Sequence, residues 1–350
     1  MLTTTSVPQS AVAARPLSTP APGLIRSAAL SRLLREVAST GYRFITPSPF
    51  THQRVLANRA QQNATSWRDI FGWSMPFAAT AIEQSMLDLM DQAGVLAVDG
   101  ELLRSLVRIS SIGDDLFVHS AYPTTQDNAV FFGPDTYRFA RFIRQALAIS
   151  AGWIEPALSL VAGTPMHILD VGCGSGAGAL IAVRALSAAN IPLAVTMNDI
   201  NPLALRYALV NADIAGIAVN IALGDALSCL NGRFDLIVCN PPYLDDDAQR
   251  AYRHGGARLG RALSVRMATE AIARLALGGR LLLYTGVAIV EGDDPFLAEI
   301  GPVLDAAGCD WSYGEIDPDV FGEEIERPVY AHVDRIAAVG LIAQRKREPA

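Results

Sequence analysis

From about residue 165 the chain alternates short apolar runs with helical patterns. Strands are predicted at residues 166–172, 192–199, 219–225, 234–240 and 280–286, and helices at 174–189, 202–216 and 264–279. Strands and helices that alternate at this spacing form parallel βαβ units with right-handed crossovers. Continuous apolar strands fit a sheet that is covered on both faces. The pattern therefore predicts a doubly wound, mostly parallel α/β sheet.

The preceding part of the chain predicts a smaller, mainly helical domain. Residues 30–39 and 79–96 carry apolar side chains at three- and four-residue spacing, as amphipathic helices do. Residues 107–122 predict a hairpin that turns at Gly113-Asp114. Pro134 is a typical first residue of a helix, so a further helix is expected there.

These patterns divide the chain into three predicted parts. The first 22 residues are rich in Ser, Thr, Ala and Pro and contain no acid, which favours a disordered tail at 1–22. A substrate-recognition domain is expected at 23–130 and the α/β domain at 131–350. The α/β domain should end in a strand pair that closes the sheet around a loop at 323–328.

A glycine-rich turn follows the first predicted strand. Gly172, Gly174, Gly176 and Gly178 alternate with other residues there. Glycines permit a tight turn and let a ligand approach the backbone at a helix N-terminus. Because Gly172, Gly174 and Ala177 also satisfy the pattern of dinucleotide sites, a nicotinamide-dependent oxidoreductase using the same loop is an alternative.

Acidic residues lie at or just after the next strand ends. Asp170 precedes the glycines, Asp199 ends the second predicted strand, and Asp225 ends the third. A carboxylate at position 199 can accept both hydroxyl groups of a ribose, and one at position 225 can accept the amine of an adenine. The order of these acids predicts a site for a cofactor that contains adenosine.

The fourth predicted strand ends in Asn240-Pro241-Pro242-Tyr243 instead of an acid. The Asn240 side chain and the Pro241 carbonyl offer two acceptors, and the prolines have no N–H that competes for them. Two fixed acceptors can hold an –NH2 group, and Tyr243 can stack on the flat group that carries it. The segment therefore predicts a substrate site for a planar amide or an aromatic amine.

Together these motifs resemble the class I S-adenosylmethionine-dependent methyltransferases. They resemble more narrowly the branch with an Asn-Pro-Pro-Tyr motif, which includes release-factor glutamine N5-methyltransferases and adenine N6-methyltransferases. The resemblance spans roughly residues 131–286 and implies a Rossmann-like fold, S-adenosyl-L-methionine as cofactor, and transfer of a methyl group to nitrogen.

The resemblance also implies roles for single residues. Gly172, Gly174 and Gly176 would line the methionine and ribose portion of the cofactor, with Asp170 near the methionine amino group. Asp199 would hold the ribose and Asp225 the adenine, with Asn240 also lining the cofactor. Asn240, Pro241 and Tyr243 would be catalytic and, with Pro242, would bind the substrate.

The acceptor stays open between protein glutamine, nucleic-acid adenine and a small metabolite. Gly133-Pro134-Asp135 stands where the glutamine methyltransferases carry Pro-Arg-Pro. A cofactor-binding scaffold without turnover is a further alternative. A macromolecular acceptor, selected by the N-terminal part, is the primary hypothesis.

The segment after Tyr243 is rich in arginine. Five arginines fall within seventeen residues, together with His254, for which a structural or exposed role is favoured; the arginines are Arg250, Arg253, Arg258, Arg261 and Arg266. They either clamp a phosphate or an acidic protein patch, or they form a solvated face that balances Asp245, Asp246 and Asp247. The net charge of −7 argues against broad nucleic-acid binding by bulk electrostatics.

Cysteine usage and hydropathy argue against a metal-binding, a disulfide-bonded or a membrane-spanning protein. None of the four cysteines forms a C-x-x-C pair or a zinc-spaced cluster with histidine, so we expect free thiols in a reducing compartment and no metal. No apolar run reaches membrane-spanning length without charges or helix breakers. A soluble, cytoplasmic enzyme is the resulting expectation.

Overall fold

The structure is a computed structural model that describes residues 22–148 and 164–346. Its helices are α1 (Pro22–Ser39), α2 (Pro49–Ala57), η1 (Arg68–Gly72), η2 (Ala79–Ala81), α3 (Gln84–Ala93), α4 (Pro134–Ala148), α6 (Ala177–Leu186), η3 (Ser187–Ala189), α7 (Pro202–Ala215), α8 (Ala262–Ala273), α9 (Pro295–Ala306), η4 (Gly322–Glu326) and η5 (Pro328–Tyr330). Its strands are β1 (Leu96–Asp99), β2 (Leu102–Ser105), β3 (Val107–Ile112), β4 (Asp115–Ser120), β5 (Met166–Val171), β6 (Leu193–Asp199), β7 (Asn220–Leu223), β8 (Phe234–Cys239), β9 (Leu275–Ile289), β10 (Cys309–Asp317) and β11 (Arg335–Arg345). The predicted disordered tail lies, apart from Pro22, outside the described residues.

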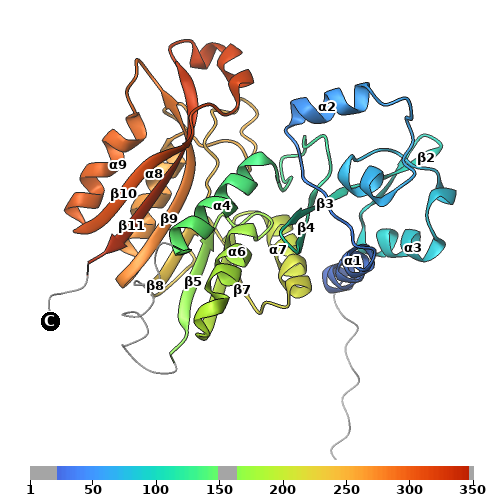
Figure 1. Ribbon diagram of the computed structural model, residues 1–350, viewed down its shortest axis with the longest axis horizontal. Helices are drawn as coiled ribbons and strands as arrows, with labels where there is room; N and C mark the ends of the chain where they lie inside the picture. The colour runs from blue at the N-terminus through green and yellow to red at the C-terminus, as the bar shows by residue number, and fades with distance from the viewer. Residues whose placement is uncertain (1–21, 149–163, 347–350) are drawn as a thin grey trace, which may run out of the picture.

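A seven-stranded sheet forms the centre of the larger part of the molecule (Figure 1). Its strand order is β10-β11-β9-β8-β5-β6-β7. Strands β9, β8, β5, β6 and β7 are parallel to one another, and β11 runs antiparallel to both of its neighbours. The predicted mostly parallel sheet and its closing strand pair are therefore confirmed.

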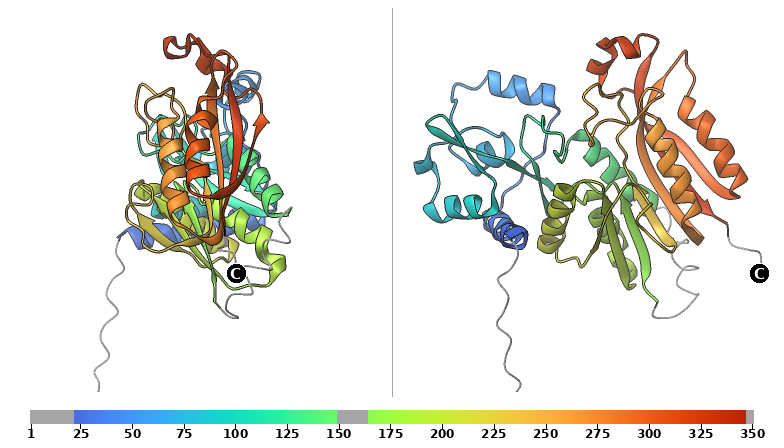
Figure 2. Two further views of the ribbon diagram at one scale, coloured as in Figure 1. Left: turned by 90° about the vertical axis from the view of Figure 1, so that its left-hand side faces the viewer. Right: turned by 180° about the vertical axis from the view of Figure 1, so that it is seen from behind.

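Alternate side chains of the strands belong to two separate hydrophobic cores, one on each face of the sheet. On β8, Leu236 and Val238 join the core formed with α4, α6 and α7, whereas Ile237 and Cys239 join the core formed with α8 and α9. Figure 2 shows the second of these helix layers facing the viewer in its right-hand panel. Two covered faces explain why the parallel strands are apolar throughout, without polar alternation.

The predicted helix at 264–279 is wrong in its second half. Helix α8 ends at Ala273, and β9 already begins at Leu275 beside Phe234 of β8. The pairing of these two strands is irregular between Phe234 and Leu236, and Gly278 in the extra length of β9 has a φ of +79°. An apolar run that ends in two glycines fits both a helix and a strand, so hydrophobic periodicity alone does not distinguish the two here.

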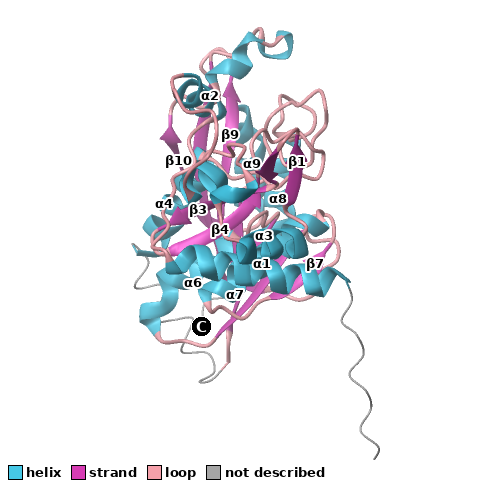
Figure 3. Ribbon diagram, turned by 90° about the vertical axis from the view of Figure 1, so that its right-hand side faces the viewer, coloured by secondary structure: helices cyan, strands magenta, loops and turns pink. Residues whose placement is uncertain are grey.

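The N-terminal part packs its own core against helix α7. Helices α1, α3 and α7 lie side by side in Figure 3. Ala204, Tyr207 and Val210 of α7 belong to the same apolar cluster as the buried side chains of α1 and α3. The predicted hairpin is confirmed as β3 and β4, whereas the short hairpin of β1 and β2 was not predicted. The domain boundary predicted at residue 130 stays a proposal, since the core of the N-terminal part also includes side chains of α7, a helix that packs on the seven-stranded sheet.

Asn211 of α7 joins the hairpin to the glycine-rich turn. Its side chain is fully buried. Its Oδ1 accepts from the N–H of Val118 at 2.8 Å, and its Nδ2 donates to the carbonyls of Val118 at 3.1 Å and of Ser175 at 2.9 Å. One amide thus satisfies backbone groups in strand β4 and in the turn that precedes α6.

We predict that Asn211→Ala lowers the free energy of unfolding by about 3 kcal/mol, because it leaves buried backbone groups without partners. Chemical denaturation followed by circular dichroism measures the change. Asn63→Ala is the control, since Asn63 is exposed in the N-terminal part. Equal stability of the two variants would contradict the bridging role of Asn211.

Candidate active site

A cavity of about 360 Å³ lies at the carboxyl ends of the parallel strands. Its walls come from the glycine-rich turn, the ends of β6 and β7, the segment after β8, helix α8 and the segment that leads into α4. The strand order reverses between β5 and β8, and in open α/β sheets ligands bind in the crevice at that point. Its volume falls in the range of small-molecule sites, about 300 to 1,000 Å³.

The glycine-rich turn needs its glycines for conformation. Gly172, Gly174 and Gly176 have φ values of +67°, +53° and +80°. These values lie in the left-handed region that side chains with a Cβ disfavour. A Cβ at Gly176 would also lie 3.1 Å from the Met197 side chain. The turn therefore presents bare backbone to the cavity, as predicted for a ligand that approaches closely.

Asp199 holds this turn from the end of β6. Its Oδ2 accepts from the N–H of Gly174 and its Oδ1 from the N–H of Asn201, both at 2.8 Å. Burial raises the pKa of Asp199, while these backbone hydrogen bonds act in the opposite direction. A carboxylate has about four acceptor positions, so it can accept further hydrogen bonds from the cavity side.

Asp170 lies under the turn. Its side chain is buried, and its Oδ2 accepts from the N–H of Ala179 in the first turn of α6 at 2.8 Å. A Cβ at Gly178 would lie 2.8 Å from this carboxylate, which explains why position 178 is glycine. Burial, and to a smaller extent the charge of Asp199, raises the pKa of Asp170 to about 7. The residue lines the cavity and also anchors the start of α6.

Asp225 is paired with an arginine from helix α8. Nη1 and Nη2 of Arg266 donate to the two carboxylate oxygens at 2.9 and 2.7 Å. This interaction lowers the pKa of Asp225. Both side chains line the cavity. The sequence predicts that Asp225 binds the adenine, but it does not predict that Arg266 holds this carboxylate.

The Asn-Pro-Pro-Tyr segment lies directly after β8 and lines the same cavity. Asn240 and Pro241 therefore share a cavity with the glycine-rich turn. Tyr243 is mostly buried, and its hydroxyl donates to Asp135. Its ring lies against Gly286, where a Cβ would approach Cε2 to 2.2 Å, and its centroid is 5.9 Å from that of Phe321. Tyr243 is thus a fixed wall, and its hydroxyl is already engaged.

Asp135 is a residue that sequence reasoning did not assign to the site. It lies in the first turn of α4, is buried, and also accepts from the hydroxyl of Tyr284 at 2.9 Å. Arg138 pairs with it at 3.0 Å and with Asp317 at 2.9 Å. Burial raises the pKa of Asp135 against these partners. The available signals were the place of Gly133-Pro134-Asp135, where the glutamine methyltransferases carry Pro-Arg-Pro, and a carboxylate at the N-terminus of a predicted helix, where the helix dipole favours negative charge.

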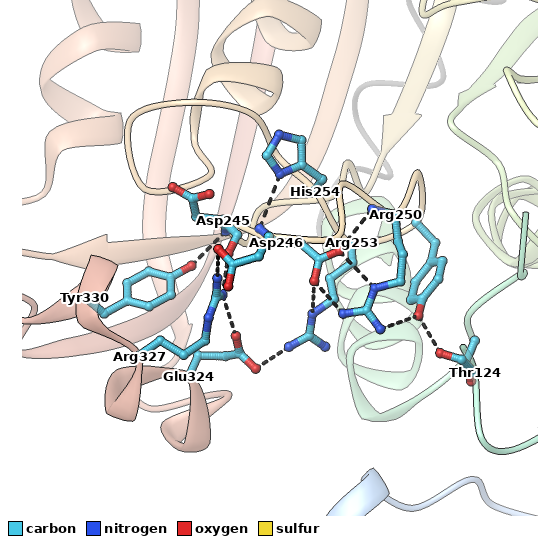
Figure 4. A network of polar contacts seen from close by, with 11 residues as sticks. Thr124, Asp245, Asp246, Arg250, Arg253, His254, Glu324, Arg327 and Tyr330 are labelled. Carbon is cyan, nitrogen blue, oxygen red and sulfur yellow. Dashed lines mark hydrogen bonds and ion pairs between the residues drawn. The ribbon is translucent and has the colours of Figure 1, made fainter. Parts of the chain in front are cut away.

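The arginines of the segment 250–266 pair with acids of the same chain, as Figure 4 shows for Arg250 and Arg253. Arg250 and Arg253 both pair with Asp246, and Arg253 also pairs with Glu324. The other members of the cluster pair with acids too: Arg258 and Arg261 with Glu299, and Arg266 with Asp225. The interpretation that these arginines balance nearby acids is right for Asp246, but most of their partners lie far away in the sequence.

His254, for which a structural or exposed role is predicted, lines the cavity and also holds the loop after Tyr243. Its Nδ1 accepts from the N–H of Asp246 at 3.2 Å. Among residues 22–148 and 164–346 there is no group of three His, Cys, Asp or Glu side chains placed to hold a metal ion. Within the same ranges no helix is long and apolar enough to cross a membrane.

The sheet order, the glycine-rich turn and the acidic strand ends have the arrangement that the resemblance to the class I S-adenosylmethionine-dependent methyltransferases implies. Residues 158–287 match the family model described as Methyltransferase small domain. The resemblance seen in the sequence is confirmed for this part of the chain, and the oxidoreductase alternative is not favoured.

Two curated relatives share this part of the chain. A release factor glutamine methyltransferase of Deinococcus radiodurans is 37% identical over 169 residues, which is 45% of this chain and 55% of that protein. A ribosomal RNA small subunit methyltransferase C of Sodalis glossinidius is 38% identical over 79 residues, 23% of this chain and 21% of that protein. The chain thus spans about half, or less, of the length of these relatives.

A ribosomal protein L11 methylase from Lactobacillus delbrueckii subsp. bulgaricus superposes with a TM-score of 0.37 at 18% identity, covering 62% of this chain and 81% of that one.

The residues of the cavity fit S-adenosylmethionine. Asp199 offers acceptors for ribose hydroxyls, and the positive-φ glycines leave room for a ligand against the backbone. Asp225 offers a carboxylate for an adenine amine, held in place by Arg266. Asn240 closes the side of the cavity toward β8.

We predict that Asp199→Ala weakens the binding of S-adenosylmethionine by about 10- to 100-fold, because hydrogen bonds to a charged group contribute about 1.5 to 3 kcal/mol. Isothermal titration calorimetry measures the dissociation constant. Asp213→Ala is the control, since Asp213 is exposed and pairs with Arg35 on the N-terminal part. An unchanged dissociation constant for Asp199→Ala would rule out the ribose role.

Proposed function

We propose that this protein is an S-adenosylmethionine-dependent N-methyltransferase that acts on a planar amide or amine nitrogen of a macromolecule. The observation that carries the proposal is the position of Asn240 and Pro241, which line the same cavity as the glycine-rich turn and Asp199. Two acceptors beside a cofactor site are what an –NH2 acceptor group requires. The names of the two curated relatives, one for glutamine and one for ribosomal RNA, support transfer to a macromolecule.

The chain's contribution to such a reaction is orientation. The Asn240 side-chain oxygen and the Pro241 carbonyl accept hydrogen bonds from the two N–H groups of the acceptor and so direct the nitrogen lone pair into the cavity. Bound S-adenosylmethionine supplies an electrophilic methyl group. Amide and aryl amine nitrogens are poor nucleophiles, and fixing them in line contributes much of the rate. No general base is assigned, because the nitrogen becomes acidic once it is methylated.

A protein amide is the acceptor that the charges favour. Each arginine of the segment 250–266 has an acidic partner within the protein, so this segment offers little net positive charge to a phosphate backbone. Nucleic-acid adenine is the second candidate, supported by the name of the ribosomal RNA relative.

We also propose that the protein acts in the cytoplasm. All four cysteines are free thiols, which suits a reducing compartment. The release factor and the ribosomal RNA in the names of the relatives point in the same direction.

We predict that Asn240→Ala lowers the turnover number by at least about 100-fold, because the acceptor nitrogen loses one of its two fixed partners. The dissociation constant of S-adenosylmethionine, measured by calorimetry, should stay within about threefold, because the glycine-rich turn and Asp199 are untouched. Loss of cofactor binding in step with loss of turnover would contradict the assignment of Asn240 to the acceptor.

The acceptor itself can be found with methyl-labelled S-adenosylmethionine, the purified protein and a cell extract. The labelled macromolecules are divided and treated with protease or with nuclease, and Asn240→Ala serves as the blank. We expect protease to release the label. Label released only by nuclease would make adenine the acceptor, and no label above the blank would contradict the proposed function.

A further inference from the structure

Aromatic side chains from three distant segments build one side of the cavity. Phe131 precedes α4, Tyr243 and Tyr252 follow β8, and Phe321 lies between β10 and β11; all of them line the cavity. Phe131 stacks on Tyr252 with a centroid distance of 6.1 Å and an interplanar angle of 10°. Tyr243 meets Phe321 edge to face at 5.9 Å and 69°. Flat walls around Asn240 and Pro241 suit a planar acceptor group.

The backbone that carries these rings has little regular structure, so other contacts must place it. Asp246 is only 4% exposed and is the first centre of such contacts. Its carboxylate accepts from Nε and from the backbone N–H of Arg250, at 2.9 and 3.0 Å, and forms an ion pair with Arg253 at 3.5 Å. The hydrogen bond from Arg250 lowers the pKa of Asp246 to about 2, so this carboxyl is ionised at neutral pH.

Glu324 is the second centre and joins the β10–β11 connection to the same loop. It is 6% exposed, whereas Glu323 and Glu326 are exposed. Its two carboxylate oxygens pair with Arg253 and with Arg327, the latter at 3.0 Å. Figure 4 shows the chain of contacts running from Arg250 through Asp246, Arg253 and Glu324 to Arg327.

Two backbone contacts complete the attachment of the β10–β11 connection. The guanidinium of Arg327 donates to the carbonyl of Asp245, and the hydroxyl of Tyr330 accepts from the N–H of the same residue at 2.8 Å. On the other side of the loop, the hydroxyl of Tyr252 donates to the carbonyl of Thr124 at 2.6 Å. The network therefore reaches all three segments that supply the aromatic rings.

Phe321 depends directly on the position of Glu324. Its φ is +55°, in the left-handed region that a phenylalanine rarely adopts. Its carbonyl accepts from the N–H of Glu324 at 2.8 Å, so both residues belong to one 3-10 turn. Strained conformations of this kind persist only when surrounding contacts determine them, and they gather at ligand sites.

We propose that Glu324 and Arg253 are positioning residues for the acceptor: their ion pair ties the β10–β11 connection to the loop after Tyr243 and so sets Phe321 against Tyr243 as one wall of the acceptor subsite. The proposal rests on the proposed function for the identity of the subsite. It gives a role to a carboxylate that lies 71 residues from Arg253 and that also pairs with Arg327.

The test compares Glu324→Gln with Glu323→Gln, which changes the exposed neighbour in the same turn. Hydrogen–deuterium exchange of the full chain reports on the network without any acceptor. We expect amide exchange in 245–254 to rise about tenfold in Glu324→Gln and to stay unchanged in Glu323→Gln. Unchanged exchange in 245–254 of Glu324→Gln overturns the tie between the two segments.

Transfer kinetics test the effect on the acceptor. The substrate is a dilution series of fresh extract fraction of the kind that accepted the label, together with methyl-labelled S-adenosylmethionine. Glu324→Gln should raise the apparent KM for this fraction about tenfold, and Arg253→Met should do the same. The double variant should be no worse than either single variant, because the two act as a pair. Glu324→Asp should recover part of the loss.

The dissociation constant of S-adenosylmethionine separates this role from simple unfolding. It should stay within about threefold in Glu324→Gln, since Glu324 pairs with Arg253 and Arg327, whereas Asp199 holds the glycine-rich turn. An unchanged apparent KM, or a KM and a cofactor affinity that change together, overturns the positioning role. Failure of the wild-type protein to methylate any fraction would contradict the proposed function, and the exchange experiment would still decide whether the network ties the segments.

Discussion

The reversal of strand order between β5 and β8 is the constraint on which the site depends. The helix that follows β5 and the segment that follows β8 leave the sheet in opposite directions, so a crevice opens between two neighbouring strand ends. Everything predicted to touch the cofactor or the acceptor lies at this edge. Asp199 then fixes the glycine-rich turn through backbone N–H groups, and Asp170 fixes the start of α6 beneath it. The crevice is therefore shaped by carboxylates that are already hydrogen-bonded within the protein.

Asp135 holds the proposed acceptor side of the cavity in a comparable way. A buried carboxylate is costly unless hydrogen bonds and a counter-charge stabilise it, and Asp135 has the hydroxyls of Tyr243 and Tyr284 together with Arg138. These partners join α4, the Asn-Pro-Pro-Tyr segment and β9 around one side chain. The consequence for Tyr243 is that its ring cannot turn freely. A fixed ring loses less conformational entropy when a planar group stacks on it, which favours orientation over adaptability.

The sequence was sufficient for features that depend on local pattern. Apolar runs located the parallel strands, the glycines located the turn, and the order of strand-end residues located the crevice. Features that depend on partners distant in sequence were missed. Nothing near Asp135 indicates that two tyrosines, 108 and 149 residues away, donate to it. The division between α8 and β9 was misplaced for a different reason, since an apolar run before Gly278 and Gly279 fits both periodicities.

The arginine-rich segment shows why a local charge count is a poor guide to a partner. In sequence, positions 250–266 carry five arginines and no acid, a pattern that fits an anion clamp as well as a solvated face. In the fold, acids from α9, from the end of β7 and from the β10–β11 connection meet these side chains. Buried acids such as Glu324 would be strongly destabilising without a cation, so part of the arginine content compensates for carboxylates elsewhere. Each arginine of the segment has an acidic partner, so in the proposed reaction the acceptor would be selected by the shape of the aromatic walls and by the hydrogen-bond acceptors at Asn240 and Pro241.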